Sequence, residues 1–78
     1  MIVSISNDFF CTPNQSEAIQ FATILSRVQN DLVSVVRSYS DFSKCWYFYI
    51  EKGVAFVRTN EELIGEFDKG KQLNKRSN

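Results

Sequence analysis

The chain has few side chains that could make or break bonds, and histidine is absent from all 78 residues. Histidine is the commonest general base near neutral pH and the commonest metal ligand, so Ser-His and Cys-His nucleophile pairs and His-containing zinc sites are excluded. Two cysteines cannot complete a structural zinc site, and the three glycines fit neither a P-loop nor a dinucleotide fingerprint. The sequence therefore predicts a protein that is not an enzyme and that holds no metal or cofactor.

The remaining reactive groups fit structural roles. Glu62 and Glu66 are four residues apart and would share one side of a helix, where a solvated face is a simpler interpretation than an acid-base pair. Cys11 and Cys45 favour two free thiols in a reducing cytosol, with a disulfide between them as the alternative. No secretion signal and no stretch of about 18–20 apolar residues is present, so we expect a cytoplasmic protein without a membrane partner.

The stretch from Cys45 to Thr59 carries the strongest structural pattern in the chain. Residues 45–50 and 54–59 are rich in aromatic and β-branched types, and Gly53 suits the positive φ of a turn, so we predict a β-hairpin. A three-residue turn sorts its side chains into two faces. The predicted core face comprises Trp46, Phe48, Ile50, Val54 and Phe56, and the outer face comprises Cys45, Tyr47, Tyr49, Ala55, Val57 and Thr59.

The N-terminal part of the chain predicts a strand followed by a helix. Weak alternation favours a strand at 2–6, paired with the hairpin, and we expect Phe9 and Phe10 to bury against the next helix. Thr12-Pro13-Asn14-Gln15 predicts the start of that helix, with Thr12 as the N-cap and the proline at the first helical position. An apolar stripe then follows at helical spacing, formed by Ala18, Phe21, Ala22, Leu25 and Val28.

The other segments contain one ambiguous and one clear pattern. Asn30-Asp31 is a plausible helix end, after which the Val-rich residues 32–39 favour a strand, with an extension of the helix as the alternative. Thr59-Asn60-Glu61-Glu62 is a second capping signature, so we predict a second helix that ends at Gly70. Residues 71–78 hold one apolar residue and should form a disordered basic C-terminal tail.

Together these elements predict one small α+β domain over residues 1–70. The expected order is β-α-β-β-β-α, with a mainly antiparallel sheet and helices packed on one face. A chain of this length buries roughly 60% of its unfolded surface, which is enough for one modest core but not for a deep substrate cavity as well.

These features favour a non-enzymatic protein-binding module. A small stand-alone protein of this kind can act as an inhibitor that blocks a host protein sterically, and viruses and mobile elements often encode such proteins. The predicted partner contacts lie on the outer face and in the loop before the hairpin, and they comprise Tyr47, Tyr49, Val57, Arg58, Asp41 and Lys44.

Two further hypotheses stay open. Aromatic residues with a basic neighbour, together with the basic tail, are also typical of single-stranded nucleic-acid binders. The balance of nine basic against nine acidic residues makes this less favoured, because phosphate contacts need an excess of cations. The third hypothesis is a self-associating structural protein that forms a homodimer through its outer face or a sheet edge.

Overall fold

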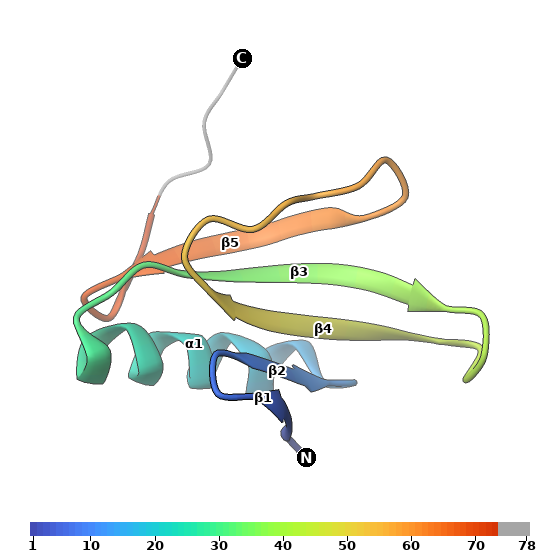
Figure 1. The fold of residues 1–78 in the computed structure, drawn as a ribbon, viewed down its shortest axis with the longest axis horizontal. Helices are drawn as coiled ribbons and strands as arrows, with labels where there is room; N and C mark the ends of the chain where they lie inside the picture. Colours follow the sequence, from blue (N-terminus) through green and yellow to red (C-terminus); the bar gives the residue numbers. More distant parts are fainter. Residues whose placement is uncertain (74–78) are drawn as a thin grey trace.

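The computed structural model describes residues 1–73, which form a six-stranded antiparallel sheet with one helix against one of its faces (Figure 1). The strands lie in the order β1-β2-β4-β3-β5-β6. The predicted α+β class and antiparallel sheet are confirmed, whereas the predicted second helix and the element order are wrong. Within residues 1–73, no helix combines the length and the apolar character needed to cross a bilayer.

The chain starts with two short strands. The strand predicted at 2–6 exists as β1 (Val3–Ser6), but it pairs with β2 (Phe9–Thr12) rather than with the predicted hairpin. β2, which the sequence analysis missed, then pairs with β4. Adjacent residues of a strand point to opposite faces, so only Phe10 packs on the helix as expected, with its ring 4.8 Å from that of Phe21. Phe9 lies on the other face.

The predicted helix is confirmed as α1 (Gln15–Gln29), with a different N-cap and with Val28 of the predicted apolar stripe 74% exposed and outside the core. The cap is Asn14, whose side-chain oxygen accepts a hydrogen bond from the backbone N–H of Glu17 at 2.9 Å. Thr12 ends β2 instead, where its buried hydroxyl donates to the Glu17 carboxylate at 2.7 Å. Asn30 adopts the left-handed conformation with φ of 56°, so the predicted helix end at Asn30-Asp31 is also confirmed.

The centre of the sheet is a hairpin of β3 (Val33–Ser40) and β4 (Cys45–Lys52), so the strand predicted at 32–39 is confirmed over the helical alternative. The predicted hairpin of 45–50 with 54–59 is wrong. β4 has β3 on one side and β2 on the other, so both of its edges are occupied and 54–59 has no strand to pair with. Residues 53–61 form an irregular connection, which we call the crossover segment.

The second predicted helix is a strand, β5 (Glu62–Asp68), which pairs antiparallel with β3 through a bulge between Val35 and Val36. A two-residue strand, β6 (Lys71–Gln72), then pairs with the end of β5. The predicted tail at 71–78 therefore begins with paired residues, and 74–78 lie outside the described residues.

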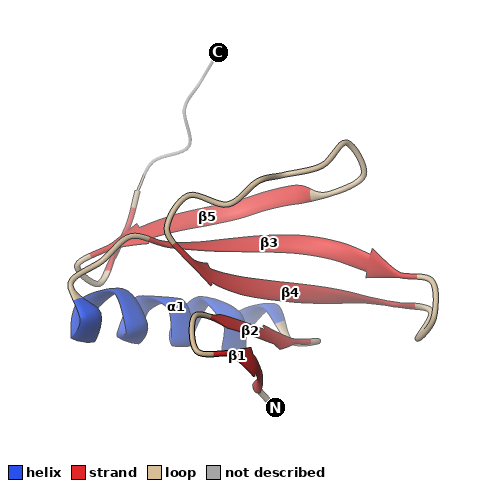
Figure 2. Ribbon diagram, in the orientation of Figure 1, coloured by secondary structure: helices blue, strands red, loops and turns tan. Residues whose placement is uncertain are grey.

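The two long connections of the sheet lie on opposite faces. β2 and β3 both run antiparallel to β4, so β2 and β3 are parallel to each other. β4 and β5 both run antiparallel to β3, so they are parallel to each other as well. A connection between two parallel strands must cross over the sheet. Each crossover moves toward the β6 edge of the sheet, but the two crossovers start from strands that run in opposite directions. Both connections can therefore have the preferred right-handed sense only if they pass over opposite faces of the sheet. Figure 2 shows this arrangement, with α1 behind the sheet and the crossover segment in front of β3 and β5.

The core lies between α1 and the sheet and consists of Ala18, Ala22, Val33, Val35, Phe48, Ile50 and Phe67. Two predicted core residues are therefore confirmed, since Phe48 and Ile50 are 7% and 0% exposed. The other three are wrong, because Trp46, Val54 and Phe56 are 42%, 77% and 85% exposed. Trp46 points to the core face near the β3–β4 turn, where the Arg37 guanidinium lies 4.0 Å from its ring, and the other two belong to the crossover segment.

Candidate partner-binding surface

The sheet face opposite α1 carries the candidate surface, and we call it the open face. Residues that pair across two strands lie on the same face of the sheet, so the core residues show which face each position occupies. Phe10 and Val35 lie opposite Ile50 on the helix side, and the residues next to them in each strand point to the other face. The open face carries Phe9 and Cys11 from β2, Ser34, Val36 and Ser38 from β3, and Tyr47, Tyr49 and Glu51 from β4.

An aromatic pair forms the middle of the open face. The rings of Phe9 and Tyr49 stack with their centroids 5.5 Å apart and their planes at 12°. Offset stacking of this kind stabilises a pair by about 0.5–1.5 kcal/mol beyond its buried area. The two strands therefore present one continuous, partly buried aromatic surface.

The crossover segment is attached to the open face at its start. The Gly53 N–H donates to the Leu32 carbonyl at 2.6 Å, and the Ser34 hydroxyl donates to the Gly53 carbonyl at 2.7 Å. Gly53 has φ of 90°, a conformation that glycine adopts without strain. The predicted positive φ at this position is confirmed, although the turn leads into a crossover and not into a hairpin.

A local turn fixes the other end of the segment. The Arg58 N–H donates to the Glu61 carboxylate at 3.0 Å, and the Glu61 N–H donates to the Arg58 carbonyl at 3.0 Å. The predicted capping signature, with Thr59 as the cap and Glu62 reaching back, is therefore wrong. The bonded pair is Arg58 with Glu61, one residue earlier, and it closes a tight turn after which the chain continues as a strand. Both ends of the crossover segment are hydrogen-bonded.

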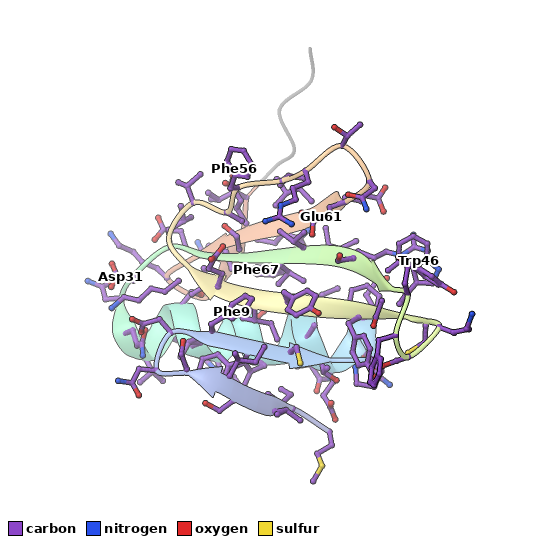
Figure 3. All side chains as sticks on the ribbon, turned by 45° about the vertical axis from the view of Figure 1, so that its right-hand side comes forward. Phe9, Asp31, Trp46, Phe56, Glu61 and Phe67 are labelled. Atoms are coloured by element: carbon purple, nitrogen blue, oxygen red, sulfur yellow. The ribbon has the colours of Figure 1, made fainter. Side chains whose placement is uncertain are left out.

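A groove of about 490 Å³ lies between the crossover segment and the open face, and it is partly open to solvent. Figure 3 shows Phe9 on one side of the central strands and Phe56 and Glu61 on the other. The groove is lined by Phe9, Val36, Ser38, Tyr49, Glu51, Phe56, Arg58 and Glu61. The lining therefore combines aromatic and aliphatic side chains with three charged ones, Glu51, Arg58 and Glu61.

The phenol of Tyr49 lies in the groove, where burial and nearby negative charge both raise its pKa. Burial is the main factor that raises the pKa of Tyr49, and neighbouring negative charge, including that of Glu61, raises it further. The phenol therefore stays protonated at neutral pH and can donate a hydrogen bond to a carbonyl or carboxylate placed in the groove.

The groove brings together part of the predicted contact set. Tyr49 and Arg58 both line it, and Tyr47 lies beside it, opposite the lining residue Ser38. Val57 lies on the crossover segment, 38% exposed, but outside the lining.

Asp41 and Lys44 lie elsewhere. They are exposed residues of the β3–β4 turn, where the Lys44 N–H donates to the Ser40 carbonyl at 2.7 Å. They do not line the groove, so the predicted contacts divide between the groove and this turn.

Sequence reasoning missed four lining residues that matter for binding, namely Phe9, Glu51, Phe56 and Glu61. Phe9 could have been found from the pair Phe9-Phe10, because two adjacent aromatic residues in a strand must serve opposite faces. Glu51 could have been found from alternation along β4, because it lies two residues beyond Tyr49. No local signal indicates Phe56 or Glu61, since their position depends on the path of the crossover segment.

The cysteines are free thiols, as expected. Cys11 lies opposite Tyr49 and Cys45 lies opposite Ser40, so the register separates them by four residues along β4. That is about 13 Å, beyond the Cα separation that a disulfide spans. Within residues 1–73, no group of three or more Cys, Asp or Glu residues is placed to hold a metal ion.

Comparison with protein-family models, with curated proteins and with solved structures finds no match for this chain.

Proposed function

We propose that this protein is a non-enzymatic binding module that recognises another protein through the groove on its open face. The observation that supports this most directly is Phe56, an aromatic side chain 85% exposed at the edge of a groove with an aromatic floor. Exposed aromatic residues beside a pocket are typical binding hot spots, because a partner removes their area from water. The protein would then act by occupying the partner's surface and blocking it sterically.

The energetic argument rests on what Phe56 gains in a complex. Full burial of such a side chain contributes about 1.5–3 kcal/mol, and an 85% exposed ring has most of that gain still available. The fold itself gains little from this ring. Single exposed apolar side chains such as Phe42 are common on protein surfaces, so what favours a partner at Phe56 is its place beside the groove and not its exposure alone.

The test is affinity purification from the native host, with identification of bound proteins by mass spectrometry. Phe56→Ser should retain the circular dichroism spectrum and lose the partner, with a dissociation constant raised about 10- to 100-fold. Phe42→Ser is the matched control, because Phe42 is 97% exposed but lies in the β3–β4 turn. If Phe42→Ser loses the partner and Phe56→Ser keeps it, the turn and not the groove is the contact.

The nucleic-acid hypothesis stays a prediction of lower rank. The groove lining has one cation, Arg58, against two carboxylates, Glu51 and Glu61, and such a balance repels phosphate. The nucleic-acid hypothesis predicts an affinity for single-stranded oligonucleotides that falls log-linearly with salt concentration. A gel shift without any complex at low salt would end it.

Self-association has one specific observation in its favour. β1 is an edge strand without charged residues, and its Val3 and Ile5 side chains are 52% and 51% exposed. An uncharged edge can pair with the same edge of a second copy about a two-fold axis. Light scattering at two concentrations tests this, and Ile5→Lys should abolish any dimer that uses this edge.

A further inference from the structure

We infer that the segment bound in the groove is an extended peptide with an apolar side chain between two basic ones, at positions i, i+2 and i+4. This inference rests on the proposed function and specifies the partner's chemistry. It follows from the distribution of apolar and acidic groups along the open face.

The middle of the groove is apolar. Tyr49 and Val36 are directly opposite each other on β4 and β3, and Phe9 stacks on the tyrosine ring from β2. Phe56 supplies an exposed ring from the crossover segment. A side chain that enters here meets apolar surface on more than one side, so the central residue of the ligand should be aromatic or a large aliphatic.

A carboxylate lies toward each end of the groove, and Arg58 lies beside the one at the Glu61 end. Glu51 lies one residue pair beyond Tyr49, opposite Ser34. Glu61 lies toward the other end, next to Glu62, which pairs with Arg37. From the level of Ser34 to that of the lining residue Ser38 is four residues of strand, or about 13 Å.

The negative charge on this face is not neutralised by ion pairs. Ser34 also pairs with Glu66 of β5, so a third carboxylate shares the face. The ion pairs within residues 1–73 involve Glu17, Glu62 and Asp31, and none of these is an open-face carboxylate. Arg58 is the one basic residue of the lining, so acidic groups exceed basic ones.

Strand geometry converts this arrangement into a spacing. Side chains at i, i+2 and i+4 of an extended peptide lie on one face and span about 13 Å. Lys or Arg at i and i+4 would reach the two carboxylates while the residue at i+2 enters the apolar middle. A phosphate backbone or an acidic peptide would place negative charge against Glu51 and Glu61.

The experiment is a titration of the full-length, nitrogen-15-labelled protein, followed by amide chemical shifts. The probes are acetyl-Lys-Ser-Phe-Ser-Lys-amide, its charge-reversed form with Glu at both ends, and a form with Gly in place of Phe. The basic aromatic peptide should shift the amides of Tyr49, Glu51 and Phe56 and bind at least tenfold more tightly than either of the others. The variant Glu51→Gln/Glu61→Gln should weaken it about two- to fivefold for each charge removed.

Several results would overturn the inference. Equal or better binding of the acidic peptide would contradict the charge argument while leaving the groove as a protein-binding site. No binding by any peptide would also overturn it, and the separate comparison of Phe56→Ser with Phe42→Ser would still decide the proposed function. Shifts of the groove amides in Lys75→Ser/Arg76→Ser without peptide would identify the chain's own terminus as the occupant and overturn the inference.

Discussion

Replacing Ser34 by alanine should release the start of the crossover segment from the sheet. The Ser34 side chain is fully buried, and its hydroxyl donates to the Gly53 carbonyl at 2.7 Å. The variant removes this donor without changing the backbone or the core. The other bond at this point, from the Gly53 N–H to the Leu32 carbonyl, remains.

The size of the effect follows from the hydrogen bond. A typical intramolecular hydrogen bond contributes about 1 kcal/mol, and a buried carbonyl left without a donor costs about 1–3 kcal/mol. Gly53 is partly exposed, so water can reach its carbonyl in part. We expect Ser34→Ala to lower the free energy of unfolding by about 1–2 kcal/mol, which lowers the Tm by roughly 4–16 °C in a domain of this size.

Urea denaturation measures the lower free energy of unfolding, and amide hydrogen exchange measures the release of the start of the crossover segment. Exchange of the Gly53 amide, which donates to the Leu32 carbonyl, should accelerate about tenfold in Ser34→Ala, since 1.4 kcal/mol corresponds to a factor of ten. Ser38→Ala is the matched control, because Ser38 lies on the same face of the same strand and makes no side-chain hydrogen bond within residues 1–73. Its stability should change by less than about 0.5 kcal/mol. Equal effects of the two substitutions would refute the role assigned to the Ser34 hydroxyl.

Three further predictions concern the helix start and two of the glycines. Hydrogen bonds from the N-terminal ammonium group and from Thr12 hold the pKa of Glu17 below its ordinary value of 4.5. A lowered pKa adds stability above pH 4.5, and this stability is lost as the pH falls through the folded-state pKa. The free energy of unfolding, measured by urea denaturation, should therefore fall less between pH 7 and pH 3 in Glu17→Gln than in the unmodified protein. Gly53→Ala should cost about 1–2 kcal/mol in the same assay, because φ of 90° strains any side chain. Gly65→Ala should be nearly neutral, since its Cβ would meet only the mobile end of Gln72 at 2.6 Å; a cost above about 2 kcal/mol would show that Gln72 cannot move.

The parts of the fold that local patterns determine could be predicted from the sequence. α1 has an apolar stripe and a left-handed residue at its end, and β3 is Val-rich, so their types follow from nearby residues. The N-cap was misplaced by two positions because both Thr12 and Asn14 are good capping residues. Long-range pairing decided between them, since β2 needs Thr12 as its last residue.

The other parts depend on contacts that no local pattern contains. Residues 54–59 have strand composition, but the neighbours of β4 are chosen from distant segments and both positions are taken. Residues 59–70 have a capping signature and helical spacing, yet Gly65 weakens a helix by about 1 kcal/mol and β3 offers an unpaired edge. β5 fills that edge and buries Phe67 to 1% exposure.

The candidate site was predictable only in part for the same reason. Tyr47 and Tyr49 follow from alternation along one strand. The groove also needs β2 beside β4 and the crossover segment over β3, and neither is encoded near the tyrosines.

Site-specific photo-cross-linking in the native host tests the central proposal most directly. A photoreactive phenylalanine analogue would be placed at Phe56, and in a second variant at Val28, which is 74% exposed on α1 and so on the opposite side of the sheet. We expect a discrete cross-linked protein from position 56 and none from position 28. The same product from both positions, or a product from position 28 alone, would contradict a binding surface on the open face.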